Sequence, residues 1–317
     1  MSRKVVGMAF DSQEAKGISL VFLTALVSGA SIFLNKYAVS MADAVVFTTL
    51  KNVSVAAFLV SILFFAGSFG RLSALSKRAW AKLALVGAVG GSVPFLLFFQ
   101  GLSLTSAAGA SFVHKTMFVW VAVLAAIFLK EKLNAKLLAA AGLLMAANLM
   151  LFGIPSLNEG ILLVFAATLF WSAETVMAKK FLEEFRAEEV MFGRMFFGSL
   201  VMLGFLAATG KAGAVLELSS AQAGWVLFTA LLLLAYVWTW FKGLQLASAT
   251  TATMVLLLGS PITTVLELAF SAKAVSLNAA IGTALIVLGV VAAVGVSELA
   301  SVAAAVPRQL PFLAKKR

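Results

Sequence analysis

Apolar stretches of about 20 residues recur along the whole chain and are separated only by short polar connections. A helix of this length can cross the hydrocarbon core of a bilayer, which is about 30 Å thick. Inside that core every backbone N–H and C=O needs a partner within the protein, and a helix supplies these partners locally. Ten such stretches are expected, near residues 17–38, 43–66, 80–101, 105–128, 134–153, 158–180, 188–208, 221–242, 247–270 and 275–296. The sequence therefore predicts an all-α membrane protein with ten transmembrane helices.

The composition supports this class of protein. Hydrophobic residues occupy 62% of the 317 positions and charged residues 12%, whereas soluble domains are about half apolar and about a quarter charged. The chain has no cysteine, which excludes disulfides, thiolate metal sites and a cysteine nucleophile. It has one histidine, so we expect neither a metal site nor a cofactor. The segment 1–16 is too polar for the core of a signal peptide, so the first helix should be retained.

The basic residues define an orientation. If the N-terminus is cytoplasmic, 18 of the 24 Lys and Arg residues lie in cytoplasmic tails and loops, and only Lys211 and Lys273 lie outside. The remaining four, which fall within spans, are Lys36, Lys51, Lys115 and Arg194. An excess of Lys and Arg in cytoplasmic loops is typical of multi-pass membrane proteins. The net charge of +11 thus indicates a cell-membrane protein with both termini cytoplasmic, and no nucleic-acid partner.

The two halves of the sequence resemble each other. An offset of 143 places Lys36 on Lys179 and Lys51 on Arg194, and an offset of 142 places QGLSLTSAAGASF on KGLQLASATTATM. Each half then contains five spans, so the second half enters the membrane with the opposite orientation. Inverted repeats are common in secondary transporters, where the substrate site lies between the repeats. The alternative is a chance match, because apolar residues align easily.

Longer segments carry a family resemblance. The first half contains GLSLTSAAGASF, FLKEKL and AAAGLLMAANLML, and the second contains GLQLASATTATMVLLLGSPITTVLELAF and IGTALIVLGVV. With Lys36 late in the first span and Lys51 in the second, these segments resemble the EamA-type permeases, ten-helix members of the drug/metabolite transporter superfamily. The resemblance runs from about Gly17 to Gly295.

The resemblance implies an architecture and a broad activity. It implies five-helix repeats over 17–153 and 158–296, between a cytoplasmic tail at 1–16 and a basic cytoplasmic tail at 297–317. It also implies transport of a small molecule, with export more frequent than import, and it leaves a homodimer open. Members of the family carry very different metabolites, so the resemblance does not identify the substrate.

Three features depart from the family pattern. A proline is frequent midway along the fourth helix of the family, but the fourth span of this chain has Val119 there. The proline, Pro261, lies instead at the equivalent place of the ninth span, 142 residues later. The short acidic motif has Glu131 in the first half, and no acid lies near Lys273 in the second. The pair His114 and Lys115 is not part of the pattern.

Charged residues inside spans are the candidate substrate-binding or coupling residues, because each should face protein or water. They are Lys51, Lys115, Arg194, Glu174 and Glu267, joined by Lys36, by His114 beside Lys115, and by Asn35 at the end of a polar stripe. Structural ion pairs explain these charges as well as substrate or proton handling does. We expect Lys115 to face a central cavity and to pair with Glu174 or Glu267 when no substrate is bound, with His114 as a hydrogen-bonding neighbour. Pro261 could flex the ninth span or form only a static kink.

These observations predict secondary active transport of a small metabolite, with an amino-acid-like or other anionic or zwitterionic solute favoured. No nucleotide-binding loop is present, so a gradient of protons, sodium or solute should drive an exporter by alternating access, with the two halves rocking. The chain is not expected to be an enzyme, because no orienting acid accompanies Ser111 and His114. The alternative is a non-transporting membrane scaffold or an intramembrane enzyme. The expected partners are therefore the lipid bilayer, a small-molecule substrate and a coupling ion.

The charge distribution makes the topology testable. We expect a reporter that is active only outside the cytoplasm to be inactive when fused after Arg317, because ten spans return the chain to its starting side. A reporter that works only in the cytoplasm, fused at the same residue, serves as the control. Activity of the external reporter would contradict the orientation.

Overall fold

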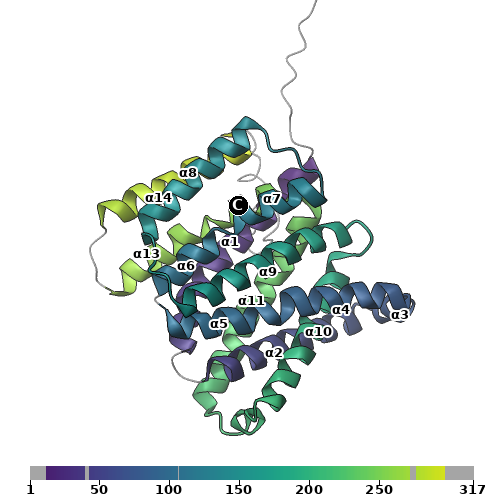
Figure 1. The fold of residues 1–317 in the computed structure, drawn as a ribbon. Helices are drawn as coiled ribbons and strands as arrows, with labels where there is room; N and C mark the ends of the chain where they lie inside the picture. The colour runs from purple at the N-terminus through teal and green to yellow at the C-terminus, as the bar shows by residue number, and fades with distance from the viewer. Residues whose placement is uncertain (1–11, 40–42, 106, 272–275, 297–317) are drawn as a thin grey trace, which may run out of the picture.

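The computed structural model describes residues 12–39, 43–105, 107–271 and 276–296, and all regular elements in this part of the chain are helices (Figure 1). Ten helices or broken helix pairs within it are long and apolar enough to span a membrane, which confirms the predicted number. Seven of these spans are unbroken, and six of them are α1 (Ser12–Val39), α2 (Ala44–Phe65), α8 (Ala135–Phe152), α9 (Glu159–Phe181), α10 (Ala187–Ala208) and α14 (Leu277–Val294). The seventh is α11 (Ser220–Leu246). Two short helices, α3 (Phe69–Ser73) and η1 (Ala212–Val215), lie in connections.

The other three spans are broken in two. They are α4 (Lys77–Gly91) with α5 (Val93–Leu104), α6 (Ala107–Lys115) with α7 (Met117–Phe128), and α12 (Ala249–Leu256) with α13 (Gly259–Ser271). Backbone i→i−3 hydrogen bonds tighten the chain at the second and third breaks, at Thr116 and at Leu257–Leu258. Thr116 and Leu258 are 142 residues apart, which is the offset of the sequence repeat, so the two breaks lie at equivalent places in the two halves.

Side-chain caps mark where many of the helices begin. A side-chain oxygen accepts a backbone N–H at the starts of α2, α4, α8, α9, α11, α12 and α14, from Asp43, Ser76, Asn134, Asn158, Ser219, Ser248 and Ser276. Partial burial acts to raise the pKa of the Asp43 carboxyl, but Lys211 at 2.7 Å and two backbone N–H groups hold it below its usual range. The polar residues between the spans therefore end one helix and start the next.

The two halves of the chain interleave. Helix α1 packs on α11 and α9 packs on α5, while α2 packs on α11 and α10 packs on α4. By the repeat, the contact α1–α11 is equivalent to α9–α5, and the contact α2–α11 is equivalent to α10–α4. Helix α8 lies beside its own counterpart α14 (Figure 1). The architecture is thus two inverted five-helix repeats. Because the main interfaces join the two halves, the halves do not form separate blocks.

Glycines allow the closest of these crossings, and they recur with the repeat. A Cβ added to Gly243 of α11 would lie 3.0 Å from the carbonyl oxygen of Gly17 in α1, and one added to Gly101 of α5 would lie 2.7 Å from that of Gly160 in α9. The offsets of 142 and 143 relate these two pairs. Small residues that let backbones approach are a common basis of helix packing in membranes.

The crossing of α1 and α11 yields a matched pair of substitutions. We expect Gly243→Ala to destabilise the protein by roughly 1–3 kcal/mol, because the added methyl meets the backbone and side chain of α1. Gly224→Ala, on the same helix but with nothing within 4 Å of the added Cβ, should be neutral or slightly stabilising. Thermal unfolding of both variants in detergent measures the difference. Equal stability of the two variants would show that the close crossing does not require glycine at position 243.

Candidate functional site

Among the described residues, four charged side chains lie buried inside spans beyond their first turn. Their exposed fractions are 3% for Lys51 of α2, 7% for Lys115 of α6, 3% for Glu174 of α9 and 6% for Arg194 of α10. An ionised side chain in the membrane interior costs several kcal/mol unless protein or water compensates it. These four residues, all predicted from the sequence, are therefore the core of the candidate site.

Glu174 and Arg194 form an ion pair between α9 and α10. Nε of Arg194 lies 3.4 Å from Oε1 of Glu174, yet neither atom makes a hydrogen bond in the described part of the chain. The guanidinium also lies over the rings of Phe95 at 5.4 Å and Phe241 at 5.9 Å. Of the two partners expected for Lys115, Glu174 instead pairs with Arg194, and the side chain of Glu267 lies outside the described part of the structure. Arg194 reaches Glu174 directly across adjacent helices, which a pattern of single residues does not reveal.

Lys51 has an environment that mirrors the one around Arg194. Its Nζ lies 3.3 Å from Oδ1 of Asn35, and it lies over the ring of Phe99 at 4.9 Å and that of Phe47 at 5.6 Å. Phe99 and Phe241 are 142 residues apart, so each basic residue lies over the equivalent ring of the equivalent span. A cation over an aromatic face gains about 0.5–2 kcal/mol. The structure therefore brings Asn35 to Lys51 and gives the two repeats matching cation sites.

Lys115 lies at the break between α6 and α7. It is the last residue of α6, and it makes no ion pair or side-chain hydrogen bond with any residue that the structure describes. The C-terminal end of a helix carries partial negative charge, which favours a cation at this position. Lys115 is therefore a buried cation at a helix end, without an ion-pair partner in the part of the chain that the structure describes.

His114 packs among aromatic rings, and no hydrogen bond joins it to Lys115 in the described part of the chain. Its ring lies 5.3 Å from Phe98 and 5.1 Å from Trp171, and its Nδ1 is buried without a hydrogen-bond partner among the described residues. Trp171 also lies 5.3 Å from Phe95. These rings form a continuous aromatic layer from His114 towards the Arg194 guanidinium.

Two residues that the sequence reasoning missed complete the broken spans. Trp171 donates its Nε1–H to the carbonyl of Gly90 at 3.1 Å, and this carbonyl is the one that Pro94, which has no N–H, cannot engage. Asn148 of α8 donates to the carbonyl of Phe112 at 2.9 Å. That carbonyl is released because Thr116 N bonds Val113 instead, at 3.1 Å. An Asn in an apolar span was the available signal for Asn148; the sequence held no comparable signal for Trp171.

The remaining candidates are only partly described. Lys36 and Glu267 lie on α1 and α13, but their side chains fall outside the described part of the structure. Pro261 lies in the first turn of α13, directly after the break at Leu257–Leu258. The Leu257 carbonyl, which a residue with an N–H at position 261 would engage, accepts from Ser260 N at 2.9 Å. Pro261 is therefore accommodated at a break that already exists.

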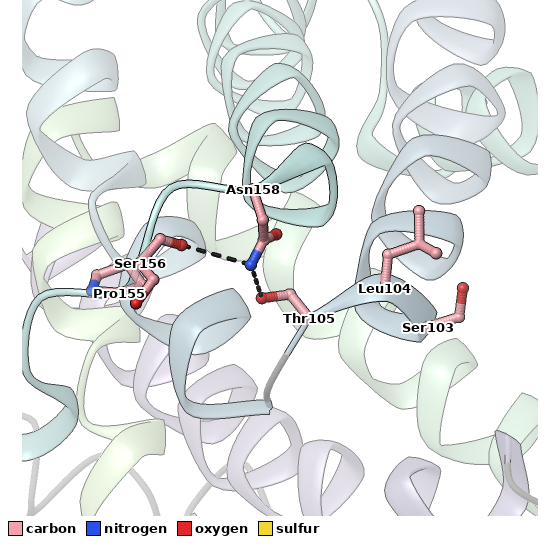
Figure 2. Close-up of a pocket in the computed structure, with 6 residues that line it drawn as sticks. All are labelled: Ser103, Leu104, Thr105, Pro155, Ser156 and Asn158. Atoms are coloured by element: carbon pink, nitrogen blue, oxygen red, sulfur yellow. Dashed lines mark hydrogen bonds between the residues drawn. The ribbon is translucent and has the colours of Figure 1, made fainter.

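A surface pocket lies away from these charges. It has a volume of about 490 Å³ and is lined by Ser103, Leu104, Thr105, Pro155, Ser156 and Asn158. Figure 2 shows Asn158 donating to Thr105 and Ser156, at 3.3 Å and 3.4 Å. The lining holds no charged side chain and belongs to the connections α5–α6 and α8–α9. We therefore place the candidate site at the buried charges and not in this pocket.

Comparison with known proteins gives a consistent assignment. The model of the EamA-like transporter family matches residues 15–153 and again residues 158–295. A solved structure titled only "Crystal structure of protein" is similar at a TM-score of 0.69 and 19% identity, covering 87% of this chain and 96% of that one. At this identity the likeness concerns the fold alone. No curated protein sequence matches the chain.

The bond between Trp171 and Gly90 predicts a coupling with Pro94. Trp171→Phe should destabilise the protein by about 1–3 kcal/mol, because the Gly90 carbonyl is left without a donor. In a Pro94→Ala background residue 94 gains an N–H for that carbonyl, so the loss caused by Trp171→Phe should shrink. Thermal unfolding of the two single variants and the double variant measures this coupling. Additive effects would contradict the assigned role of Trp171.

Proposed function

Because this chain belongs to the EamA-like transporter family, we propose that it exports a small anionic or zwitterionic metabolite across the cell membrane by alternating access. The chain is a multi-pass membrane protein, and the family is one of small-molecule transporters. The substrate class, direction and mechanism are the proposal. The observation that carries it is the imbalance of charge among the buried residues of the spans.

The buried charges favour an anion. Three cations, Lys51, Lys115 and Arg194, lie deep in spans, and among the described side chains only Glu174 offsets them there. The other buried acid, Glu189, lies in the first turn of α10 and pairs with Arg71. A substrate carboxylate or phosphate would supply the missing negative charge, whereas a purely cationic solute would meet like charge.

The Glu174–Arg194 pair offers a way to bind a zwitterion. The pair is stretched to 3.4 Å and leaves Nε and Oε1 without hydrogen bonds. A substrate carboxylate can replace Glu174 on the guanidinium while a substrate ammonium engages the carboxylate. The same exchange allows Glu174 to take up a proton or sodium ion, so either ion could drive transport.

The broken spans support alternating access. Substrate sites of transporters commonly lie near the bilayer midplane, where discontinuous helices expose backbone groups. Lys115 and Pro261 lie at such breaks, in spans that are equivalent by the repeat and in contact through α7 and α12. Because the halves interleave, we propose that half-helices move about these breaks, which replaces the rocking of two blocks.

The alternative functions have less support. A non-transporting scaffold would keep its buried lysines dry and paired, whereas Lys115 has no ion-pair partner in the part of the chain that the structure describes. An intramembrane enzyme would need a nucleophile with an orienting base. The position of Lys115 therefore favours transport.

Lys115 provides the test. In proteoliposomes loaded with a panel of amino acids, carboxylates and phosphate esters, we expect Lys115→Met to reduce transport of the active solute by roughly 30-fold or more, because a buried charge partner of the substrate is lost. Lys115→Arg should keep part of the activity. Lys132→Met removes an exposed lysine and should have no effect. Full transport by correctly folded Lys115→Met protein would refute the role of Lys115, and transport of cations alone would refute the substrate class.

A further inference from the structure

Glu131 makes a contact that joins the two halves on one face of the membrane. This face, called the basic face here, carries the connections 66–76, 129–134, 182–186 and 247–248. Oε1 of Glu131 accepts the N–H of Ala249 at 2.7 Å, and Oε2 accepts that of Thr250 at 3.1 Å. A carboxylate of the first repeat therefore caps α12, a helix of the second repeat. Charge-assisted caps of this kind complement the positive end of the helix dipole.

The backbone before Glu131 is strained in a way that directs the carboxylate. Lys130 has φ of 55°, the one positive φ at a non-glycine residue in the described part of the chain. The position that follows a helix usually holds glycine when this conformation is needed. Glu131 N then bonds the carbonyl of Ala125 at 3.2 Å, which turns the chain back at the end of α7. Strain that persists at a non-glycine residue often marks a functional position.

A second charge holds the other side of the same turn. Nζ of Lys179 lies 2.8 Å from the carbonyl oxygen of Leu244, 3.2 Å from that of Gln245 and 2.7 Å from that of Ala247. The connection between α11 and α12 thus has a cation on the carbonyl end of one helix and an anion on the N–H end of the next. Both charges match the dipoles of the helices that they touch.

Helix α12 is short and fully buried, and it is followed by a break in the helical hydrogen bonding. All eight of its residues are buried, and it ends in the run of i→i−3 bonds at Leu257, Leu258 and Ser260. Gly259 and Pro261 follow directly, so few backbone bonds link α12 to α13. Its packing partners include α7 and α1. A small rotation about this break would uncover α12 from the basic face while α13 stayed in place.

At the equivalent turn on the opposite face, the described residues make a neutral contact. There the connection between α5 and α6 is bridged by the amide of Asn158 and the hydroxyl of Thr105 at 3.3 Å, beside the pocket in Figure 2. This contact is neutral, and neutral hydrogen bonds are about half as strong as charge-assisted ones.

From these contacts we propose that α12 is the half-helix that closes the basic face, and that Glu131 is the positioning residue that holds it closed. The proposal rests on the proposed transport function, because only a transporter needs a closure that can be released. Opening requires the Glu131 carboxylate to leave the two N–H groups, and α12 then turns about the break at Leu257–Leu258. The resting protein is accordingly closed at the basic face.

Side-specific labelling tests the proposal without any substrate. The chain has no cysteine, so Thr253→Cys, at a position of α12 that is 1% exposed, serves as the reporter. A membrane-impermeant thiol reagent is applied from each side of oriented vesicles. We expect Glu131→Gln to raise the labelling rate from the basic face by about ten-fold, because a charged cap is lost, and to leave labelling from the opposite face unchanged.

Two controls separate opening of α12 from loss of the fold. Glu183→Gln makes the same change on the same face, where Glu183 is exposed and pairs with Lys180 in its own turn at 2.6 Å, and it should not alter labelling. A second reporter, Leu144→Cys, lies at a fully buried position of α8 against Gly289 of α14, and should stay protected in every variant. Lys179→Met should raise labelling of Thr253→Cys in the same direction as Glu131→Gln.

Two results would overturn the proposal. One is unchanged labelling of Thr253→Cys in Glu131→Gln, and the other is equal labelling of the two reporters in that variant. Because no solute is present, either result leaves the charge-based proposal for the substrate intact. Conversely, full transport by Lys115→Met would contradict the role of Lys115 in transport and would not affect the interpretation of the labelling.

Discussion

A backbone carbonyl released inside a bilayer has no water to bond, and the arrangement of this protein follows from how each released carbonyl finds a donor. The break between α4 and α5 frees the Gly90 carbonyl, which Trp171 of α9 engages. The break between α6 and α7 frees the Phe112 carbonyl, which Asn148 of α8 engages. These two breaks are thereby tied to neighbouring spans. The bonds that satisfy the breaks also fix the packing of the helices around them.

The same breaks make buried charge tolerable. Lys115 lies at the C-terminal end of a half-helix, where partial negative charge compensates a cation. Lys51 and Arg194 rely on aromatic faces instead, and they use the equivalent residues Phe99 and Phe241. None of the three has a complete set of strong partners. A site with several partly compensated cations is suited to a solute that brings negative charge and later leaves.

Interleaving of the repeats limits how such a protein can move. Close crossings at paired glycines join α1 to α11 and α5 to α9, so the two halves cannot separate without losing most of their packing. Half-helices at breaks are the elements with the fewest bonds to lose. One of these half-helices is α12. In the turn that precedes it, Lys179 binds the carbonyl end of α11 and Glu131 binds the N–H end of α12. The glycine crossings keep the rest of the fold closely packed, while a few strong bonds hold α12. Breaking those bonds would therefore move α12 without disrupting the fold.

The sequence by itself determined the ten spans, their inverted repetition and which charges lie inside them. Span length, the distribution of Lys and Arg, and the recurrence of residues such as Lys51 and Arg194 depend only on local composition and on a fixed offset. Only the tertiary structure decided the partners. Glu174 pairs with Arg194 instead of Lys115, Glu131 caps a helix that begins 118 residues later, and Trp171 bonds a carbonyl of another span. Apolar helices present similar surfaces to many neighbours, so the choice of neighbour depends on close packing at glycines and on single hydrogen bonds, which a linear pattern of hydrophobicity does not encode.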